Sequence, residues 1–253
     1  MTQADLAGRV TLVTGASRGI GYHAALALAK AGSHVIAIAR TQGGLEDLDD
    51  AISASGGECT LVPMDLKNLD GIDQLGGIIH ERWGRLDGLF ANAGILGEIT
   101  LAAHTTPKTW DDVIATNLTA NVRLIRSLDP LLRKSKAGRA VFQTSGVAAS
   151  RRAYWSAYAA SKAGLEAFVQ CYAKEAESSP LRVNLLNPGA TRTAMRAKAM
   201  PGEDPALLPN PEDIAPLIVK MLSEQFVEND TIVTYRDTTY FASKPKQRAL
   251  PLN

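Results

Sequence analysis

The stretch TGASRGIG at residues 14–21 lies between a short apolar run, residues 10–13, and an alanine-rich helical pattern, residues 20–31. A turn between a strand and a helix brings unpaired N–H groups and the positive end of a helix dipole to one point. Glycines in that turn let the backbone approach a phosphate closely. The spacing is Gly-x-x-x-Gly-x-Gly rather than Gly-x-Gly-x-x-Gly, and glycine also forms turns in any fold. In this context the stretch predicts a dinucleotide-binding turn.

Beyond this turn, short apolar runs alternate with longer helical patterns along the chain. This alternation predicts βαβ units, with a parallel sheet and helices on both of its faces. A long helical region at residues 110–132 is expected to be interrupted near Pro130. The sequence therefore predicts an α/β fold, a Rossmann-type doubly wound parallel sheet of about seven strands in three α/β/α layers. The predicted strands are residues 10–13, 34–39, 59–63, 86–91, 139–144, 181–186 and 231–235, and further helices are predicted at residues 45–55, 69–83, 157–177 and 211–224.

No linker or repeat breaks the alternation, so residues 1–253 are predicted to form one NAD(P)-binding domain. Residues 192–210 lack a clear period and contain several prolines. Because a long irregular loop in a compact domain is usually functional, we interpret this segment as a substrate lid. The polar, proline-containing tail at residues 242–253 is predicted to be loosely held.

The composition argues against several classes of protein. A hydrophobic content of 45% and a charged content of 21% are globular values, and a net charge of +1 predicts no strong attraction to nucleic acid or membrane. The two cysteines, Cys59 and Cys171, and the four histidines show no metal-ligand spacing, so no metal site is predicted. The first residues lack a signal-peptide pattern and no apolar run reaches membrane-spanning length, which predicts a cytoplasmic protein.

The second predicted strand ends at Arg40, where a dinucleotide fold often places an acidic residue that binds a ribose 2′-hydroxyl. An arginine at this position suits a 2′-phosphate, and Arg18 in the glycine turn could reach the same group. Two solvated surface arginines are the alternative interpretation. The pattern predicts a preference for NADP(H), with NAD(H) still possible.

Tyr158 and Lys162 are four residues apart in a predicted helix, so their side chains share one face. A free phenol has a pKa of about 10, too high for proton transfer at neutral pH. A cation about 4 Å away, at an effective dielectric constant of about 20, favours the phenolate by about 4 kcal/mol. That energy lowers the pKa of the phenol by about three. The spacing alone is common on solvated helices, so the interpretation depends on the rest of the chain.

Further motifs follow the predicted strands in a fixed order. They are Asp65-Leu66, Asn92-Ala93-Gly94, Asn117, Ser145, Tyr158 with Lys162, and Asn187-Pro188-Gly189-Ala190-Thr191. Together with the glycine turn, this order resembles the short-chain dehydrogenase/reductase superfamily in its single-domain branch, over about residues 8–235. Residues 155–162 and 187–196 look like a bacterial subgroup of uncharacterised oxidoreductases, which supplies no substrate.

The resemblance implies a role for each of four catalytic residues. Tyr158 would be the acid/base, and Lys162 would lower its pKa and bind the nicotinamide ribose. Ser145 would donate a hydrogen bond to the substrate oxygen. Asn117 would hold a water that links Lys162 to solvent, whereas a local backbone bond is the alternative for a helical asparagine.

The resemblance also implies the cofactor contacts. Asp65 would touch the adenine and Asn92 would shape the cofactor floor, although either could simply form a turn. Thr191 would contact the nicotinamide carboxamide. The full predicted set is Gly15, Ser17, Arg18, Gly19, Ile20, Gly21, Arg40, Asp65, Leu66, Asn92, Ala93, Gly94, Tyr158, Lys162, Pro188, Gly189 and Thr191.

The predicted substrate pocket consists of Ser145, Val147, Tyr154, Trp155 and Tyr158. Tyr154 and Trp155 precede the catalytic tyrosine by one helical turn and could equally be packing residues. Three basic residues open the lid segment: Arg192, Arg196 and Lys198. They would either attract an acidic substrate, such as a phosphopantetheine thioester, or form an ordinary solvated face.

The predicted function is reduction of a small-molecule carbonyl to an alcohol, or the reverse, by hydride transfer with NADP(H). One alternative is a 3-oxoacyl thioester reductase of fatty-acid metabolism, and another is a non-catalytic cofactor-sensing protein. The alanine-rich face around Ala159, Ala160, Ala163 and Ala167 suits a homodimer or homotetramer. Many relatives end with a Gly-Gly segment that packs across a tetramer, whereas this chain has TIVTYRD at residues 231–237, which weakens the expectation of a tetramer.

Overall fold

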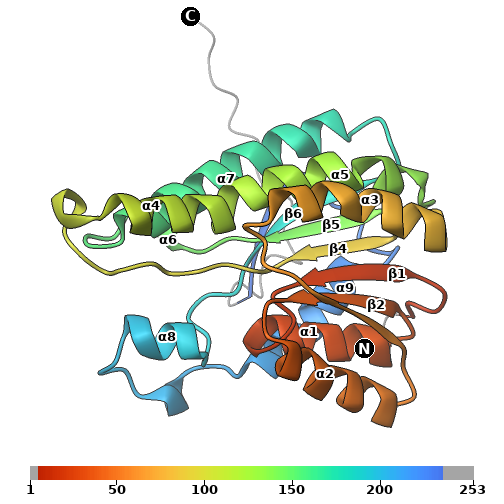
Figure 1. Cartoon of the computed structure of the whole chain (residues 1–253), viewed down its shortest axis with the longest axis horizontal. Helices are drawn as coiled ribbons and strands as arrows, with labels where there is room; N and C mark the ends of the chain where they lie inside the picture. Colours follow the sequence, from red (N-terminus) through yellow and green to blue (C-terminus); the bar gives the residue numbers. More distant parts are fainter. Residues whose placement is uncertain (1–4, 236–253) are drawn as a thin grey trace, which may run out of the picture.

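The computed structural model describes residues 5–235 and contains one sheet of seven parallel strands (Figure 1). The strands lie in the order β3-β2-β1-β4-β5-β6-β7, so the chain reverses its direction of winding between β1 and β4. This order confirms the predicted doubly wound fold. Sheets of this kind bind ligands at the carboxyl ends of the strands, where the strand order reverses. The strands are β1 (Val10–Thr14), β2 (His34–Ala39), β3 (Cys59–Pro63), β4 (Gly88–Ala91), β5 (Arg139–Gln143), β6 (Arg182–Asn187) and β7 (Thr231–Thr234).

Helices cover both faces of the sheet (Figure 1). One face packs on α1 (Gly19–Lys30), α2 (Gln42–Ala54) and α9 (Pro211–Met221). The opposite face packs on α3 (Leu69–Trp83), α5 (Ala120–Lys134) and α7 (Ser156–Glu175). Each face buries its own cluster of aliphatic side chains, as expected for parallel strands that are covered on both sides. The remaining helical segments are Ala102–His104, α4 (Pro107–Ile114), Ala115–Thr119, α6 (Val147–Ser150), α8 (Ala194–Ala199) and Pro205–Leu207.

The predicted interruption near Pro130 was wrong, because Pro130 lies inside α5. Both Pro130 and Arg126 are exposed, so the Arg126 carbonyl that loses its helical partner can face water. The irregularity lies earlier, where a π-helical turn, Ala115–Thr119, joins α4 to α5. Single π-helical turns inside longer helices often occur at functional sites.

The predicted lid segment is not wholly irregular, because it contains α8 and a short 3₁₀ turn, Pro205–Leu207. The hydroxyl of Thr193 accepts a hydrogen bond from the Arg196 N–H and caps the start of α8. Figure 1 shows α8 projecting beyond the body of the molecule. The six-residue helix was missed because it is too short to display a clear period.

Within residues 5–235, no helix combines the length and apolar character that crossing a membrane requires. The predicted tail at residues 242–253 lies outside the described residues.

Candidate active site

The end of β5 contacts three successive turns of α7. The Gln143 carbonyl accepts a hydrogen bond from Lys162 Nζ at 2.7 Å. The Thr144 hydroxyl donates to Glu166 Oε1 at 2.6 Å, and the Ser145 hydroxyl is hydrogen-bonded to Tyr158. The predicted residues Ser145, Tyr158 and Lys162 therefore meet at the carboxyl end of the sheet.

Tyr158 lies in a small apolar cluster, which we call the Trp155 cluster. Its buried members are Leu96, Trp155, Tyr158 and Ala199, with Val147 and Met200 packed against them. The rings of Trp155 and Tyr158 are 6.0 Å apart, edge to face. Burial raises the pKa of Tyr158, and the hydrogen bond from Ser145 opposes that rise. The phenol therefore holds its proton at neutral pH.

The predicted lowering of the Tyr158 pKa by Lys162 is not seen in this structure. Lys162 Nζ lies 6.0 Å from the centre of the Tyr158 ring and donates its hydrogen bond to Gln143 instead. Lys162 is itself only 3% exposed, and burial lowers its pKa to about 8, while attraction to Glu166 opposes that change. Burial thus dominates the pKa values of both residues, because it disfavours the charged form of each.

Asn117 lies in the π-helical turn and is fully buried. Its side-chain oxygen accepts from the Ile95 N–H at 2.8 Å, and its amide donates to the Ile95 carbonyl and to Ser161. A methyl group built on Gly94 would lie 3.3 Å from Asn117 Oδ1 and 3.7 Å from Lys162 Nζ. Asn117, Gly94 and Lys162 therefore face one point, while the side chain of Asn117 anchors the loop after β4, and the predicted water held by Asn117 stays a prediction.

The glycine turn fits a dinucleotide phosphate. Gly15 and Gly19 have φ angles of +68° and +58°, which favour glycine, and a methyl group on Gly19 would approach only Thr193, at 3.6 Å. The first N–H groups of α1 receive no side-chain cap from Arg18, whose side chain is exposed. Gly21 packs so closely on the Gly15 carbonyl that a methyl group would lie 2.2 Å from that oxygen. A helix N-terminus without a side-chain cap suits the anion site that the sequence predicts, which stays a prediction.

Asn92 and Ala93 join the end of β4 to this turn. Asn92 Nδ2 donates to the Thr14 carbonyl at 2.9 Å, and both backbone N–H groups bond to the Thr14 hydroxyl. Ser17 contacts the start of α2, since a methyl group on Gly44 would lie 2.9 Å from its Cβ. The side chain of Ile20 is buried in the core, so any phosphate contact there comes from its backbone N–H.

Arg40 and Asp65 lie side by side, at the ends of β2 and β3. Arg40 Nη1 is 4.0 Å from Asp65 Oδ2, and both side chains are partly exposed. Leu66, the next residue, is buried in the core. Arg40, Asp65 and Leu66, which are predicted to contact the adenosine half of the cofactor, therefore lie together. The Arg40 side chain is exposed enough to reach a 2′-phosphate.

The loop after β6 turns at Gly189, which has a φ of +68°. Asn187 Oδ1 accepts hydrogen bonds from the N–H groups of Gly189 and Gly146, at 3.1 and 3.2 Å. Thr191 is buried and its hydroxyl donates to the Pro188 carbonyl at 3.3 Å. Pro188, Gly189 and Thr191 thus form one ordered turn between β6 and the lid segment.

The lid segment covers the Trp155 cluster through Ala199 and Met200. Arg196 forms a two-pronged ion pair with Glu203, at 2.5 and 2.6 Å, so its charge is already matched. Arg192 and Lys198 are exposed. Tyr154 has a φ of +73°, is 55% exposed and lies outside the Trp155 cluster, so its place in the pocket stays a prediction.

Several residues of the site were missed by sequence reasoning. Thr14 and Asn187 belong to the quoted motifs, but their role in holding the turns was not predicted. Glu166, which accepts from Thr144, was not predicted at all. Leu96, Ala199 and Met200 complete the Trp155 cluster but come from segments with no distinctive pattern. A buried threonine at the end of a strand was the one local signal, because a hydroxyl there must find a partner.

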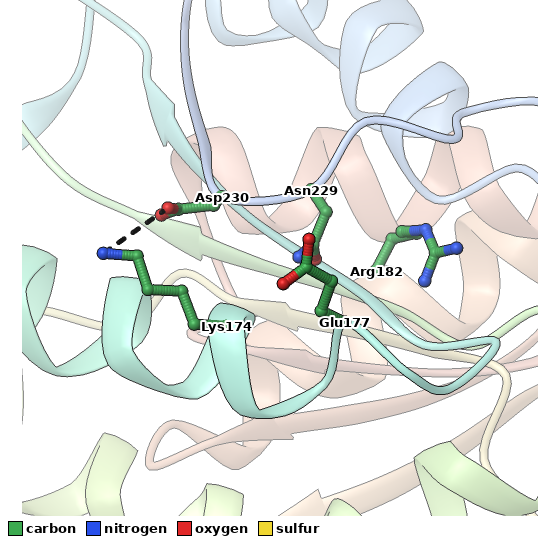
Figure 2. Close-up of a pocket in the computed structure, with 5 residues that line it drawn as sticks. All are labelled: Lys174, Glu177, Arg182, Asn229 and Asp230. Carbon is green, nitrogen blue, oxygen red and sulfur yellow. Dashed lines mark ion pairs between the residues drawn. The ribbon is translucent and has the colours of Figure 1, made fainter. Parts of the chain in front are cut away.

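A surface pocket at the opposite end of the sheet does not belong to this site. It is lined by Lys174, Glu177, Arg182, Asn229 and Asp230 (Figure 2). Lys174 points toward Asp230, 4.0 Å away. Both polar ends of Asn229 bond to the backbone, and the Arg182 guanidinium bonds to carbonyls of the preceding loop. Its polar groups therefore mainly hold β6, β7 and the end of α7 together.

The sequence is similar to short chain dehydrogenases over most of its length. Residues 9–204 match the family model for short chain dehydrogenases. An uncharacterised oxidoreductase of Escherichia coli K12, YciK, is 41% identical over 219 residues, covering 85% of this chain and 86% of that protein. A 3-oxoacyl-[acyl-carrier-protein] reductase of Synechocystis sp. PCC 6803 is 36% identical over 191 residues, covering 75% of this chain and 77% of that protein.

A solved structure agrees with these sequence matches. The crystal structure of a short chain dehydrogenase from Shigella flexneri 2a, in complex with NADP, superposes with a TM-score of 0.88 at 39% identity. The match covers 92% of this chain and 99% of the Shigella chain. The fold and the sequence similarity agree, and the family model spans the glycine turn and the Ser145, Tyr158 and Lys162 contacts. The chain therefore belongs to the short-chain dehydrogenase/reductase superfamily and is an oxidoreductase of that type.

Proposed function

We propose that this protein reduces a carbonyl group to an alcohol, or catalyses the reverse, with NADP(H) as cofactor and Tyr158 as acid/base. The observation that carries the proposal is that Ser145, Tyr158 and Lys162 lie together at the carboxyl end of the sheet, beside the apolar Trp155 cluster. Parallel α/β sheets bind ligands at that end, where the strand order reverses.

The cofactor would be held by residues that already form suitable surfaces. The free N–H groups at the start of α1 suit its pyrophosphate, and Arg18 and Arg40 suit a 2′-phosphate. Asp65 would contact the adenine, and Asn92 would form the floor of the cofactor site. Thr191 would contact the nicotinamide carboxamide. The NADP complex of the similar Shigella protein supports this assignment. When bound, NADPH supplies the hydride that reduces the carbonyl carbon.

The protein's own groups would handle the proton. Tyr158 is protonated at neutral pH because it is buried, so it can donate its proton to a carbonyl oxygen. Ser145, which bonds to Tyr158, would also donate a hydrogen bond to the charge that develops on that oxygen. Lys162 would return a proton to Tyr158, and Asn117, which faces the same point, would hold the water that links Lys162 to solvent. The Trp155 cluster would exclude water from the reacting carbonyl.

A 3-oxoacyl thioester reductase is the second candidate. The similarity to a 3-oxoacyl-[acyl-carrier-protein] reductase and the apolar wall favour it. The ion pair between Arg196 and Glu203 counts against it, because that arginine's charge is matched within the lid segment. Turnover of acetoacetyl thioesters, compared with simple ketones and diketones, distinguishes the two substrates.

A panel of ketones, diketones, quinones and aldehydes with NADPH consumption as readout tests the proposal. Tyr158→Phe should abolish turnover while NADPH binding, measured by fluorescence, is kept. Near-normal turnover by this variant would refute the assigned role. Cofactor binding without turnover across the panel would instead favour the cofactor-sensing alternative.

We propose that residues 1–253 act as one NAD(P)-binding domain and that residues 192–210 form its substrate lid. Ala160, Ala163 and Ala167 are exposed along α7, which suits close helix packing in a homodimer or homotetramer. Sedimentation at micromolar concentration tests the oligomeric state.

A further inference from the structure

A carboxylate follows the two reactive residues on the same face of α7. Tyr158, Lys162 and Glu166 are spaced four residues apart, so their side chains line one side of the helix. Sequence similarity and the proposed mechanism give roles to Tyr158 and Lys162 and none to Glu166. Glu166 lies one helical turn from a buried ammonium group, and a buried charge is costly unless it is compensated.

Glu166 is fixed in place by the end of β5. Its Oε1 accepts the 2.6 Å hydrogen bond from Thr144, whose side chain is 1% exposed. The Thr144 N–H donates in turn to the Leu186 carbonyl at 2.8 Å, which ties this residue to β6. The neighbouring residues Gln143 and Ser145 bond to Lys162 and Tyr158, so one tripeptide orients three side chains of α7.

The charged groups around Lys162 are few. From β5 and from the π-helical turn it faces neutral groups, the Gln143 carbonyl and the Asn117 amide. From its own helix it faces Tyr158 and Glu166. Among the described residues, Glu166 is the carboxylate whose attraction favours the charged form of Lys162.

We propose that Glu166, held by Thr144, is a positioning residue that keeps Lys162 positively charged one helical turn from Tyr158. The inference rests on the proposed function, in which the protonated Lys162 returns a proton to Tyr158. Glu166 itself touches neither substrate nor cofactor in this role. It acts through Lys162, as an opposite charge that offsets part of the cost of burying an ammonium group.

The first test is the pH profile of kcat/KM for NADPH-dependent carbonyl reduction. Glu166→Gln keeps the size of the side chain and an oxygen for Thr144 but removes the charge. The alkaline limb of the profile should therefore move to lower pH, by about one unit. Thr144→Val should produce a smaller shift in the same direction, and Thr144→Ser should restore the original profile. Glu175→Gln, an exposed position at the end of α7, is the matched control and should change nothing.

The second test needs no activity. A double-mutant cycle of Lys162→Met and Glu166→Gln is measured by urea unfolding of the cofactor-free protein at pH 7. If Glu166 attracts the ammonium group, Lys162→Met should raise the urea midpoint more in the Glu166→Gln background than in the unmodified chain. Additive effects overturn the inference, as does an unmoved alkaline limb. Turnover retained by Tyr158→Phe overturns the proposed function instead, so the two failures are distinguishable.

Discussion

Replacing Lys162 with methionine tests how strongly the fold opposes a positive charge at this position. Lys162 is 3% exposed, and burial lowers its pKa from 10.5 to about 8. Methionine is similar in length, carries no charge and adapts readily to an existing cavity. The comparison between the two proteins therefore isolates the protonation of one buried amine.

The sign and size of the effect follow from the two pKa values. Between pH 8 and 10.5 the unfolded chain binds more protons at this lysine than the folded protein does, so the native protein gains stability as the pH rises. The cost of the buried charge is about 3 kcal/mol near pH 7 and falls to about 1.4 kcal/mol at pH 9.5. The methionine variant has no such cost. The difference in unfolding free energy between variant and native protein should therefore shrink by about 2 kcal/mol over this range.

Urea unfolding of the cofactor-free proteins, followed by tryptophan fluorescence at several pH values, measures this difference. Lys174→Met is the matched control, because the Lys174 side chain lies on the same helix and is 71% exposed. The control should show no comparable dependence on pH. If the Lys162→Met difference were equally independent of pH, Lys162 would titrate as a free lysine, and the reasoning about its buried charge would be refuted.

Three further changes have defined outcomes. Arg40→Asp should lower kcat/KM with NADPH and raise kcat/KM with NADH, because an aspartate repels a 2′-phosphate and accepts a hydrogen bond from a ribose hydroxyl. Equal kcat/KM values for both cofactors in the unmodified enzyme would contradict the NADP assignment. Gly21→Ala should destabilise the protein by about 3 kcal/mol in urea unfolding, because its methyl group would lie 2.2 Å from the Gly15 carbonyl. Gly43→Ala, with open space around it, is the control and should be stabilising or neutral. Pro130→Ala should raise the free energy of unfolding by about 1 kcal/mol, since it restores a helical hydrogen bond, and a lower urea midpoint would contradict this.

The fold was largely predictable because its signals are local. β2, β3 and α3 have the predicted bounds, since an apolar run or an amphipathic period fixes each without reference to the rest of the chain. The errors occurred where tertiary context outweighs local preference. Pro130 was expected to break a helix, but its exposed position lets water replace the lost bond. The π-helical turn around Asn117 depends on contacts with Ile95 from the loop after β4, which no helical period reveals.

The sequence predicted that Ser145, Tyr158 and Lys162 lie together, as the structure has them, but it did not predict their electrostatics. The spacing of Tyr158 and Lys162 predicts a pair in which the cation lowers the pKa of the phenol. The spacing contained that one attraction and omitted burial, which acts on both groups and raises the pKa of Tyr158 while lowering that of Lys162. It also omitted the Gln143 carbonyl, which takes the hydrogen bond of the ammonium group. Neither burial nor a competing acceptor on another strand can be read from a four-residue spacing.

The sequence predicts which face of α7 carries Glu166, but it does not predict what that side chain contacts. Its place on the Tyr158 and Lys162 face of α7 was visible in the sequence, because four-residue steps repeat that face. Nothing in that repeat distinguishes it from a solvated glutamate, which is the commoner case. The distinction comes from Thr144, a buried residue of another element whose hydroxyl must find an acceptor. The repeat on α7 becomes part of the candidate site because the end of β5 contacts each of its three residues. Gln143 bonds to Lys162, Thr144 to Glu166 and Ser145 to Tyr158.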